Sequence, residues 1–310
     1  MSFNYLADAV DRAVAWTAPN FVFFNGTNLF LYPAGRGFNW PARVSVRTEA
    51  SWRIATGMDA APGTNNFTAG NYHDLTDMPF YVGRFAIDST RIAGKWIRLA
   101  FYPTASLTTA RRDRTFAWLQ KFVPAQIAVF GEAPFRNYTV FQRSDTVVNG
   151  GGLEHQSSQV DEVTTSQLDA SYLPGLYSHE FFHAWNVKRL RPADMVPYRY
   201  DDAQPTTWLW VSEGVTDYYG ALALVRGGGQ RQHGVLQLHC QRDRVRRWRT
   251  TDGGERCIAV AVDQSDRWQQ RTLLSEGRPH RIPSRHHDPG REQQPHVAGQ
   301  RDAPALRRDV

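Results

Sequence analysis

The chain has little cysteine and no long apolar run. Only two of its 310 residues are cysteine, Cys240 and Cys257, and both follow Arg226. The preceding residues therefore offer no disulfide framework, which leaves the redox compartment open. No basic stretch followed by an apolar one stands at the start, and no 18-residue apolar segment occurs anywhere. The sequence shows neither a signal peptide nor a membrane span, so a cytoplasmic location is the default expectation.

Lysine, phenylalanine and tyrosine are absent after Arg226. The last 84 residues hold 16 Arg, ten Gln and six His, whereas all 17 Phe and all 12 Tyr precede them. High arginine without lysine is typical of GC-rich DNA read out of frame, so one interpretation is a frameshift after about residue 226. The other is a genuine basic tail. In either case we expect residues 227–310 to be irregular or disordered.

The first 226 residues have no net charge. The formal charge of +6 comes from the last 84 residues, because the first 226 carry 20 basic and 20 acidic side chains. Nucleic-acid binding by that neutral part is therefore not expected. The alternative is phosphate binding by the arginines at 242–249, among which Trp248 is the one aromatic residue.

A metal-binding pattern stands at residues 179–183, which read HEFFH. On a helix, His179 and His183 lie on one face, so both imidazoles can hold one ion. Glu180 lies between them and can act as general base on a water at that ion, which is the zinc-peptidase signature. We predict a helix over 172–188. The competing interpretation is a helix whose two histidines are hydrogen-bonded within a core.

A third ligand is expected on a following helix. Zinc peptidases of another class take a histidine six residues after the second one, but Arg189 occupies that position. Glu213 lies on a broad apolar helical surface, where an unpaired carboxylate is costly unless a cation binds it. Asp217, one turn later, can accept a hydrogen bond from a ligand histidine and set its tautomer. The alternative for Asp217 is a solvated helix position.

A glycine-rich segment precedes the metal-binding pattern. Gly151 and Gly152 allow a backbone to approach a ligand closely, and Glu154 follows them. A carboxylate beside such a strand edge can pair with the ammonium group of a peptide N-terminus. The alternative is an ordinary turn with a surface glutamate.

The pattern of apolar residues indicates an α+β protein. Clean alternation at 43–48 predicts a half-buried strand, and strands are also expected around a turn at Asn25-Gly26. Residues 52–57, 80–87 and 96–102 are further strand candidates, and the series is typical of a mainly antiparallel β domain. Residues 109–131 have helical spacing, with Pro124 expected to bend or interrupt the helix. We therefore predict a β-rich domain at 1–105, a catalytic domain at 106–226 and the tail at 227–310.

These segments together resemble the glycyl aminopeptidase family of zinc metallopeptidases, whose members often carry a PDZ domain. The strongest likeness lies in three segments: GGLEH at 151–155, HEFFHAWNVKRLRP at 179–192 and LWVSEGVTDYY at 209–219. Weaker likeness appears at 23–27, 52–57 and 83–85. The likeness ends near residue 226, and family members usually have further strands before residue 1, so both domains are expected to be incomplete.

The resemblance implies a thermolysin-like peptidase lobe of the gluzincin type after a mainly antiparallel β domain. It implies one Zn²⁺ on His179, His183 and Glu213, with Glu180 as base and Glu154 near the substrate amine. The expected partners are peptide or protein substrates, cleaved at the N-terminal bond. The alternatives are a structural zinc site, or a catalytically impaired fragment or module that binds peptides by strand addition. Oligomeric state is not predicted.

Overall fold

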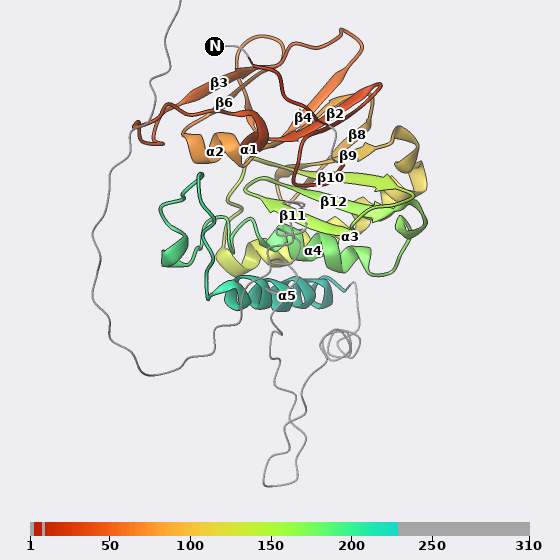
Figure 1. Ribbon diagram of the computed structural model, residues 1–310. Coiled ribbons are helices and arrows are strands. Elements are labelled where there is room, and N and C mark those ends of the chain that lie inside the picture. Colours follow the sequence, from red (N-terminus) through yellow and green to blue (C-terminus); the bar gives the residue numbers. More distant parts are fainter. Residues whose placement is uncertain (1–2, 8–9, 229–310) are drawn as a thin grey trace, which may run out of the picture. The chain divides into compact units, whose positions relative to one another are not determined.

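The computed structural model describes residues 3–7 and 10–228 of the chain (Figure 1). These residues form an α+β structure in which antiparallel sheets precede a lobe of mainly parallel strands and helices, which confirms the predicted fold class. Within this part of the chain, no helix is both long and apolar enough to cross a membrane. The predicted tail, beyond its first two residues, lies outside the described residues.

The N-terminal part forms two antiparallel sheets. The first has the order β1-β2-β7-β4, with bounds Trp16–Ala18, Phe21–Asn25, Pro79–Gly83 and Arg53–Thr56. The second has the order β3-β6-β5, with bounds Ala42–Ser45, Asn66–Ala69 and Asp59–Ala60. The strands predicted at 43–48, 52–57 and 80–87 are confirmed as β3, β4 and β7, each a little shorter.

The turn expected at Asn25-Gly26 is wrong. Asn25 instead stands at the N-cap of a short helix, α1 (Gly26–Leu29), where its backbone N–H donates to Asn28 Oδ1 at 3.0 Å. A second short helix, α2 (Tyr72–Thr76), packs so closely on Gly26 that a side chain there would meet the backbone of Leu75 and Thr76. The glycine is therefore needed for helix packing rather than for a hairpin.

The second part is built on a five-stranded sheet of order β11-β12-β10-β9-β8. The bounds, in that order, are Gly151–His155, Ser158–Thr164, Asn137–Asp145, Lys95–Tyr102 and Ala86–Ile92. Strands β9, β10 and β12 are parallel, and the two outer strands run antiparallel to their neighbours. Strand β11 therefore has a free edge on the side away from β12.

Three helices cover one face of this sheet (Figure 1): α3 (Thr109–Phe130), α4 (Leu173–Phe182) and α5 (Leu209–Arg226). Helix α3 confirms the prediction for 109–131, except that the helix continues through Pro124. Short 3-10 turns stand at Thr104–Ser106, Thr165–Gln167 and Ala193–Met195. Phe122 and Phe181 pack from the helices onto Leu99 and Tyr138 of the sheet.

The opposite face of the five-stranded sheet packs against the first sheet. Phe141 and Val160 join Phe21 and Tyr81 in one buried cluster. Both faces are thus covered, as parallel strands require. Sheet pairing divides the described strands between β7 and β8, earlier than the predicted domain boundary near residue 105, because β9 pairs directly with β10.

One buried ion pair joins the two parts. Asp77, at the end of α2, accepts from Lys188 Nζ at 2.8 Å and from the backbone N–H of Gln156 at 2.7 Å. His155 Nδ1 lies 3.3 Å from the same carboxylate. The Asp77 and Lys188 side chains are only 17% and 15% exposed. One carboxylate thus holds the β11–β12 turn and the segment after α4 against the N-terminal part.

We expect Asp77→Asn to lower the free energy of unfolding by about 3 kcal/mol, because it leaves the Lys188 ammonium buried without its counter-ion. Urea denaturation measures this change. Asp88→Asn is the matched control, since the Asp88–Arg112 pair is more than a third exposed and should change stability by less than about 1 kcal/mol. An equal effect of both substitutions would contradict the role of the buried pair.

The same pair predicts a pH dependence. Burial raises the pKa of Asp77, but the Lys188 charge and the hydrogen bonds outweigh it and hold that pKa below its ordinary value of 3.8. A depressed pKa stabilises the fold above the unfolded-state value, and this contribution is lost as the pH falls through the folded-state value. The stability difference between the native chain and Asp77→Asn should therefore persist near neutral pH and shrink below about pH 4.

Candidate metal and catalytic site

Helix α4 places both histidines of the HEFFH pattern on one face. The two Nε2 atoms lie 3.1 Å apart, and the rings meet edge to face. The helix is shorter than the predicted 172–188, since α4 ends at Phe182. The chain then continues in a series of hydrogen-bonded turns. These turns bring the carbonyl of Asn186 back to His183 Nδ1, at 2.7 Å.

Helix α5 brings Glu213 to the same point. Its Oε2 atom lies 3.3 Å from His179 Nε2 and 3.6 Å from His183 Nε2. The two helices can approach closely because Gly220 faces the backbone of α4, where even a methyl group would lie 3.2 Å from His179 Cα. Ser178 Oγ donates to the Gly220 carbonyl at 2.7 Å and strengthens this contact.

The hydrogen bonds of the imidazoles determine their tautomers. His179 Nδ1 faces Asp217 Oδ1 at 2.7 Å, and His183 Nδ1 faces the Asn186 carbonyl. A carboxylate and a carbonyl can only accept, so both Nδ1 atoms carry the proton. In the neutral imidazoles, the Nε2 lone pairs then point toward each other and toward the Glu213 carboxylate. Such an arrangement is repulsive unless a cation lies between the three atoms.

The spacing of the three atoms suits zinc. Donors about 2.1 Å from a tetrahedral ion lie about 3.4 Å from one another, and the observed separations run from 3.1 to 3.6 Å. Two imidazoles and one carboxylate are also a ligand set that catalytic zinc uses. The structure therefore brings together His179, His183 and Glu213, and it places Asp217 against Nδ1 of His179.

Glu180 lies beside this cluster, with a ligand atom within 4.8 Å of those of both histidines. The residue is 5% exposed, and its Oε2 atom has no hydrogen-bond partner among the described residues. Burial raises the pKa of Glu180 above its ordinary value, and the histidines only partly offset this rise. The carboxyl group rests against Gly152, where any side chain would collide with it.

The glycine-rich segment forms the edge strand β11, next to α4. Glu154 is partly exposed and makes no hydrogen bond within the described part of the chain. Its charge raises the pKa of both Glu180 and His183, so it lies close enough to act on the site. Gly151 has a left-handed backbone with φ of 103°. A side chain at Gly151 would contact Arg12 Nη2 at 3.6 Å instead of Glu180.

The sequence analysis missed two residues of this region. Asn186 accepts from His183 and also donates to Ser212 O at 2.9 Å and Thr216 Oγ1 at 3.1 Å, which ties the end of α4 to α5. A polar residue three positions after the second histidine was the available signal. Arg12 donates to the backbone of β11 from 138 or more residues away, and no local pattern indicated this contact.

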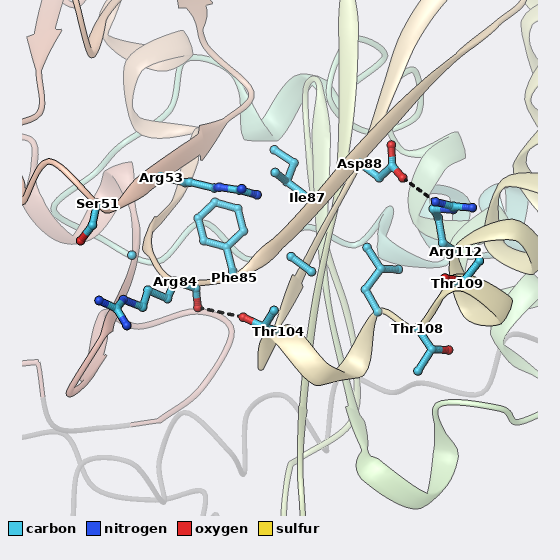
Figure 2. Close-up of a pocket in the computed structure, with 13 residues that line it drawn as sticks. Ser51, Arg53, Arg84, Phe85, Ile87, Asp88, Thr104, Thr108, Thr109 and Arg112 are labelled. Atoms are coloured by element: carbon cyan, nitrogen blue, oxygen red, sulfur yellow. Dashed lines mark hydrogen bonds and ion pairs between the residues drawn. The ribbon is translucent and has the colours of Figure 1, made fainter.

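A hollow of about 560 Å³ lies elsewhere, between the ends of β4, β8 and α3 (Figure 2). Arg53, Arg84 and Arg112 line it, and Arg112 is paired with Asp88 at 3.3 Å. None of the predicted site residues is among its lining residues. The residues predicted for the site lie instead on α4, α5 and β11.

Two family models match the chain. The M61 glycyl aminopeptidase model matches residues 173–282, and the Peptidase M61 N-terminal domain model matches residues 1–84. The first match continues beyond Arg226, into residues that the structure does not describe. The frameshift after residue 226 therefore stays a prediction. No curated protein matches the chain.

Solved structures resemble the chain as well. An aminopeptidase N family protein from Idiomarina loihiensis has 29% sequence identity and a TM-score of 0.68, over 75% of this chain and 42% of its own. An M1 zinc metallopeptidase from Deinococcus radiodurans has 15% identity and a TM-score of 0.45, over 76% of this chain and 53% of its own. The chain thus spans about half the length of these structures, or less.

We expect the purified protein to bind about one Zn²⁺ per chain and His183→Ala to abolish that binding, because two donors cannot hold the ion as three do. Asp217→Ala should weaken zinc binding about 10- to 100-fold through loss of the Nδ1 hydrogen bond. Metal analysis and competition with a chelator measure both effects. His73→Ala is the control, since His73 lies on α2, is not part of the histidine cluster, and faces Tyr200 Oη through its Nδ1 atom. Undiminished zinc in His183→Ala would refute the ligand set.

Proposed function

The chain belongs to the M61 glycyl aminopeptidase family, and on that premise we propose that it is a zinc-dependent peptidase that hydrolyses the N-terminal peptide bond of its substrates. The observation that carries this proposal is the convergence of His179 Nε2, His183 Nε2 and Glu213 Oε2 within 3.6 Å of one another. A buried carboxylate with a free oxygen stands beside them.

His179, His183 and Glu213 would hold the zinc ion. When bound, zinc supplies Lewis-acid polarisation of a carbonyl and lowers the pKa of a bound water to about 7. A structural zinc site usually has four protein ligands and is closed to water. Here the Glu213 side chain is 45% exposed and three donors converge, so the arrangement favours an open, catalytic site.

Glu180 is the proposed general base. Its position between the two histidines, its burial and its unpaired Oε2 atom leave it able to take a proton from the attacking water. The same carboxyl group can then deliver that proton to the leaving amine. Because burial raises the pKa of Glu180, that pKa lies closer to neutral pH, where one group can both accept and donate a proton effectively. Gly152 leaves room for this carboxyl group, because a side chain at that position would collide with it.

Glu154 is the proposed partner of the substrate amine. A partly buried carboxylate without a hydrogen bond in the described part of the chain is costly and favours a cationic ligand. Lys188, a buried cation close enough for the Glu154 charge to raise its pKa, is already bonded to Asp77. An α-ammonium group at Glu154 would place the first peptide bond of a substrate beside Glu180, which supports N-terminal cleavage.

Glu180→Gln should retain zinc yet lower hydrolysis of an amino-terminal peptide substrate by about 100-fold or more, the usual contribution of a general base. The amide keeps the size of the side chain but cannot accept the proton. Release of the N-terminal amino acid, followed together with metal content, measures the effect. Glu132→Gln, an exposed glutamate, is the control and should leave the rate unchanged. Undiminished hydrolysis in Glu180→Gln would remove this residue from the role of base.

Gly152→Ala should lower hydrolysis by about 100-fold without loss of zinc, because the methyl group pushes the Glu180 carboxyl group out of position. The fold should survive, since the colliding atoms belong to the end of a flexible side chain. Peptide hydrolysis and thermal unfolding measure the two effects. Gly175→Ala is the matched control on α4, where a methyl group meets nothing within 4 Å. Full activity in Gly152→Ala would show that Glu180 does not depend on this contact.

A further inference from the structure

Arg12 covers part of the free edge of β11. Its Nε atom donates to the Gly152 carbonyl and its Nη1 atom donates to the Gly150 carbonyl, both at 3.0 Å. Backbone groups alternate sides along a strand, so Gly150, Gly152 and Glu154 share the side that faces away from β12. The guanidinium therefore stands where an added strand would place its own N–H groups.

The contact with Arg12 makes the two ends of the free edge of β11 different. Extended peptides add to exposed sheet edges through backbone hydrogen bonds. At the Gly150 end of β11 the outward carbonyls are already occupied by Arg12. At the Glu154 end the structure places no such donor on the outward backbone among its described residues. A peptide that begins at Glu154 and runs toward Gly150 therefore meets the guanidinium about two residues along.

We propose that Arg12 closes the substrate groove and binds the C-terminal carboxylate of the substrate, so that the preferred substrates are dipeptides. This inference rests on the proposed function, which places the substrate amine at Glu154. The positions of Glu154 and Gly152 are about 7 Å apart along the strand. An extended dipeptide spans about the same distance from its amine nitrogen to its carboxylate carbon.

The chemistry of the two ends is complementary to a dipeptide zwitterion. Glu154 presents a negative group to the ammonium, and Arg12 presents a positive one to the carboxylate. Nη2 of Arg12 makes no hydrogen bond within the described residues, so it is available to a carboxylate. The nearby carboxylate of Glu162 is already paired with Arg143 at 2.9 Å.

The segment that carries Arg12 is anchored on both sides of the residue. Asn25 Nδ2 donates to the Arg12 carbonyl at 2.9 Å, and Asp11 accepts from Asn149 Nδ2 at 3.0 Å. Asn25 is buried as the cap of α1. The guanidinium is thus held over β11 by the N-terminal sheet and by the loop that leads into β11.

The test compares alanyl-alanine with its C-terminal amide as ligands of the zinc-loaded Glu180→Gln protein, which is expected to hydrolyse peptides about 100-fold more slowly. Titration calorimetry should give at least about 10-fold tighter binding of the free acid, because a guanidinium–carboxylate pair is lost in the amide. Arg12→Ala should weaken binding of the acid alone and remove the difference. Arg12→Lys should retain part of it, since the charge remains without the planar fork.

Equal affinities of the acid and the amide in the Glu180→Gln protein would overturn the proposal, and this comparison needs no change at Arg12. A difference that persists in a folded Arg12→Ala protein, or no binding of either ligand, would also overturn it. Hydrolysis by the native protein is measured separately. Absence of hydrolysis contradicts the peptidase proposal, whereas hydrolysis of long peptides as readily as dipeptides contradicts only the role of Arg12.

Discussion

The close approach of α5 to α4 is the constraint on which the site depends. Gly220 lies against the backbone of His179, and the Ser178 hydroxyl bonds the Gly220 carbonyl. Only at this separation can Glu213 and Asp217, one turn apart on α5, reach opposite nitrogens of the same imidazole. Asn186 adds a second tie from the end of α4 to α5. The ligand geometry is thus a consequence of helix packing.

A second constraint operates between α4 and the edge of the sheet. Glu180 is buried against Gly152, so its carboxyl group and the edge strand cannot move independently. The strand is held in turn by residues of the N-terminal part. Asp77 bonds the turn after β11, and Arg12 bonds the residues at its start. The N-terminal part therefore does more than provide a scaffold, because its residues hold the strand that lies beside the candidate site.

The parallel pairing of β9 with β10 crosses the predicted domain boundary near residue 105. Strands β8 and β9 precede the predicted boundary yet belong to the later sheet. Aromatic residues from both sheets share one buried cluster between them. The chain spans less than half the length of the Idiomarina structure, yet one side of the candidate site is buried. On the other side, the Glu213 and Asp217 side chains are partly exposed to solvent.

The sequence by itself determined the fold class, most strands, helix α3 and the identities of the clustered acids and histidines. Those features depend on local periodicity and on spacing within one helix, which the order of residues contains. The end of α4 at Phe182, the helix after Asn25 and the contacts of Arg12 and Asp77 were decided only by tertiary structure. The contacts of Arg12 and Asp77 depend on partners that are distant in the chain. The two helix ends depend on hydrogen bonds that a side chain or a backbone carbonyl makes in competition with the regular hydrogen bonds of a helix. No local sequence pattern predicts which distant backbone group a guanidinium will contact, because that contact follows from the packing of whole sheets and helices.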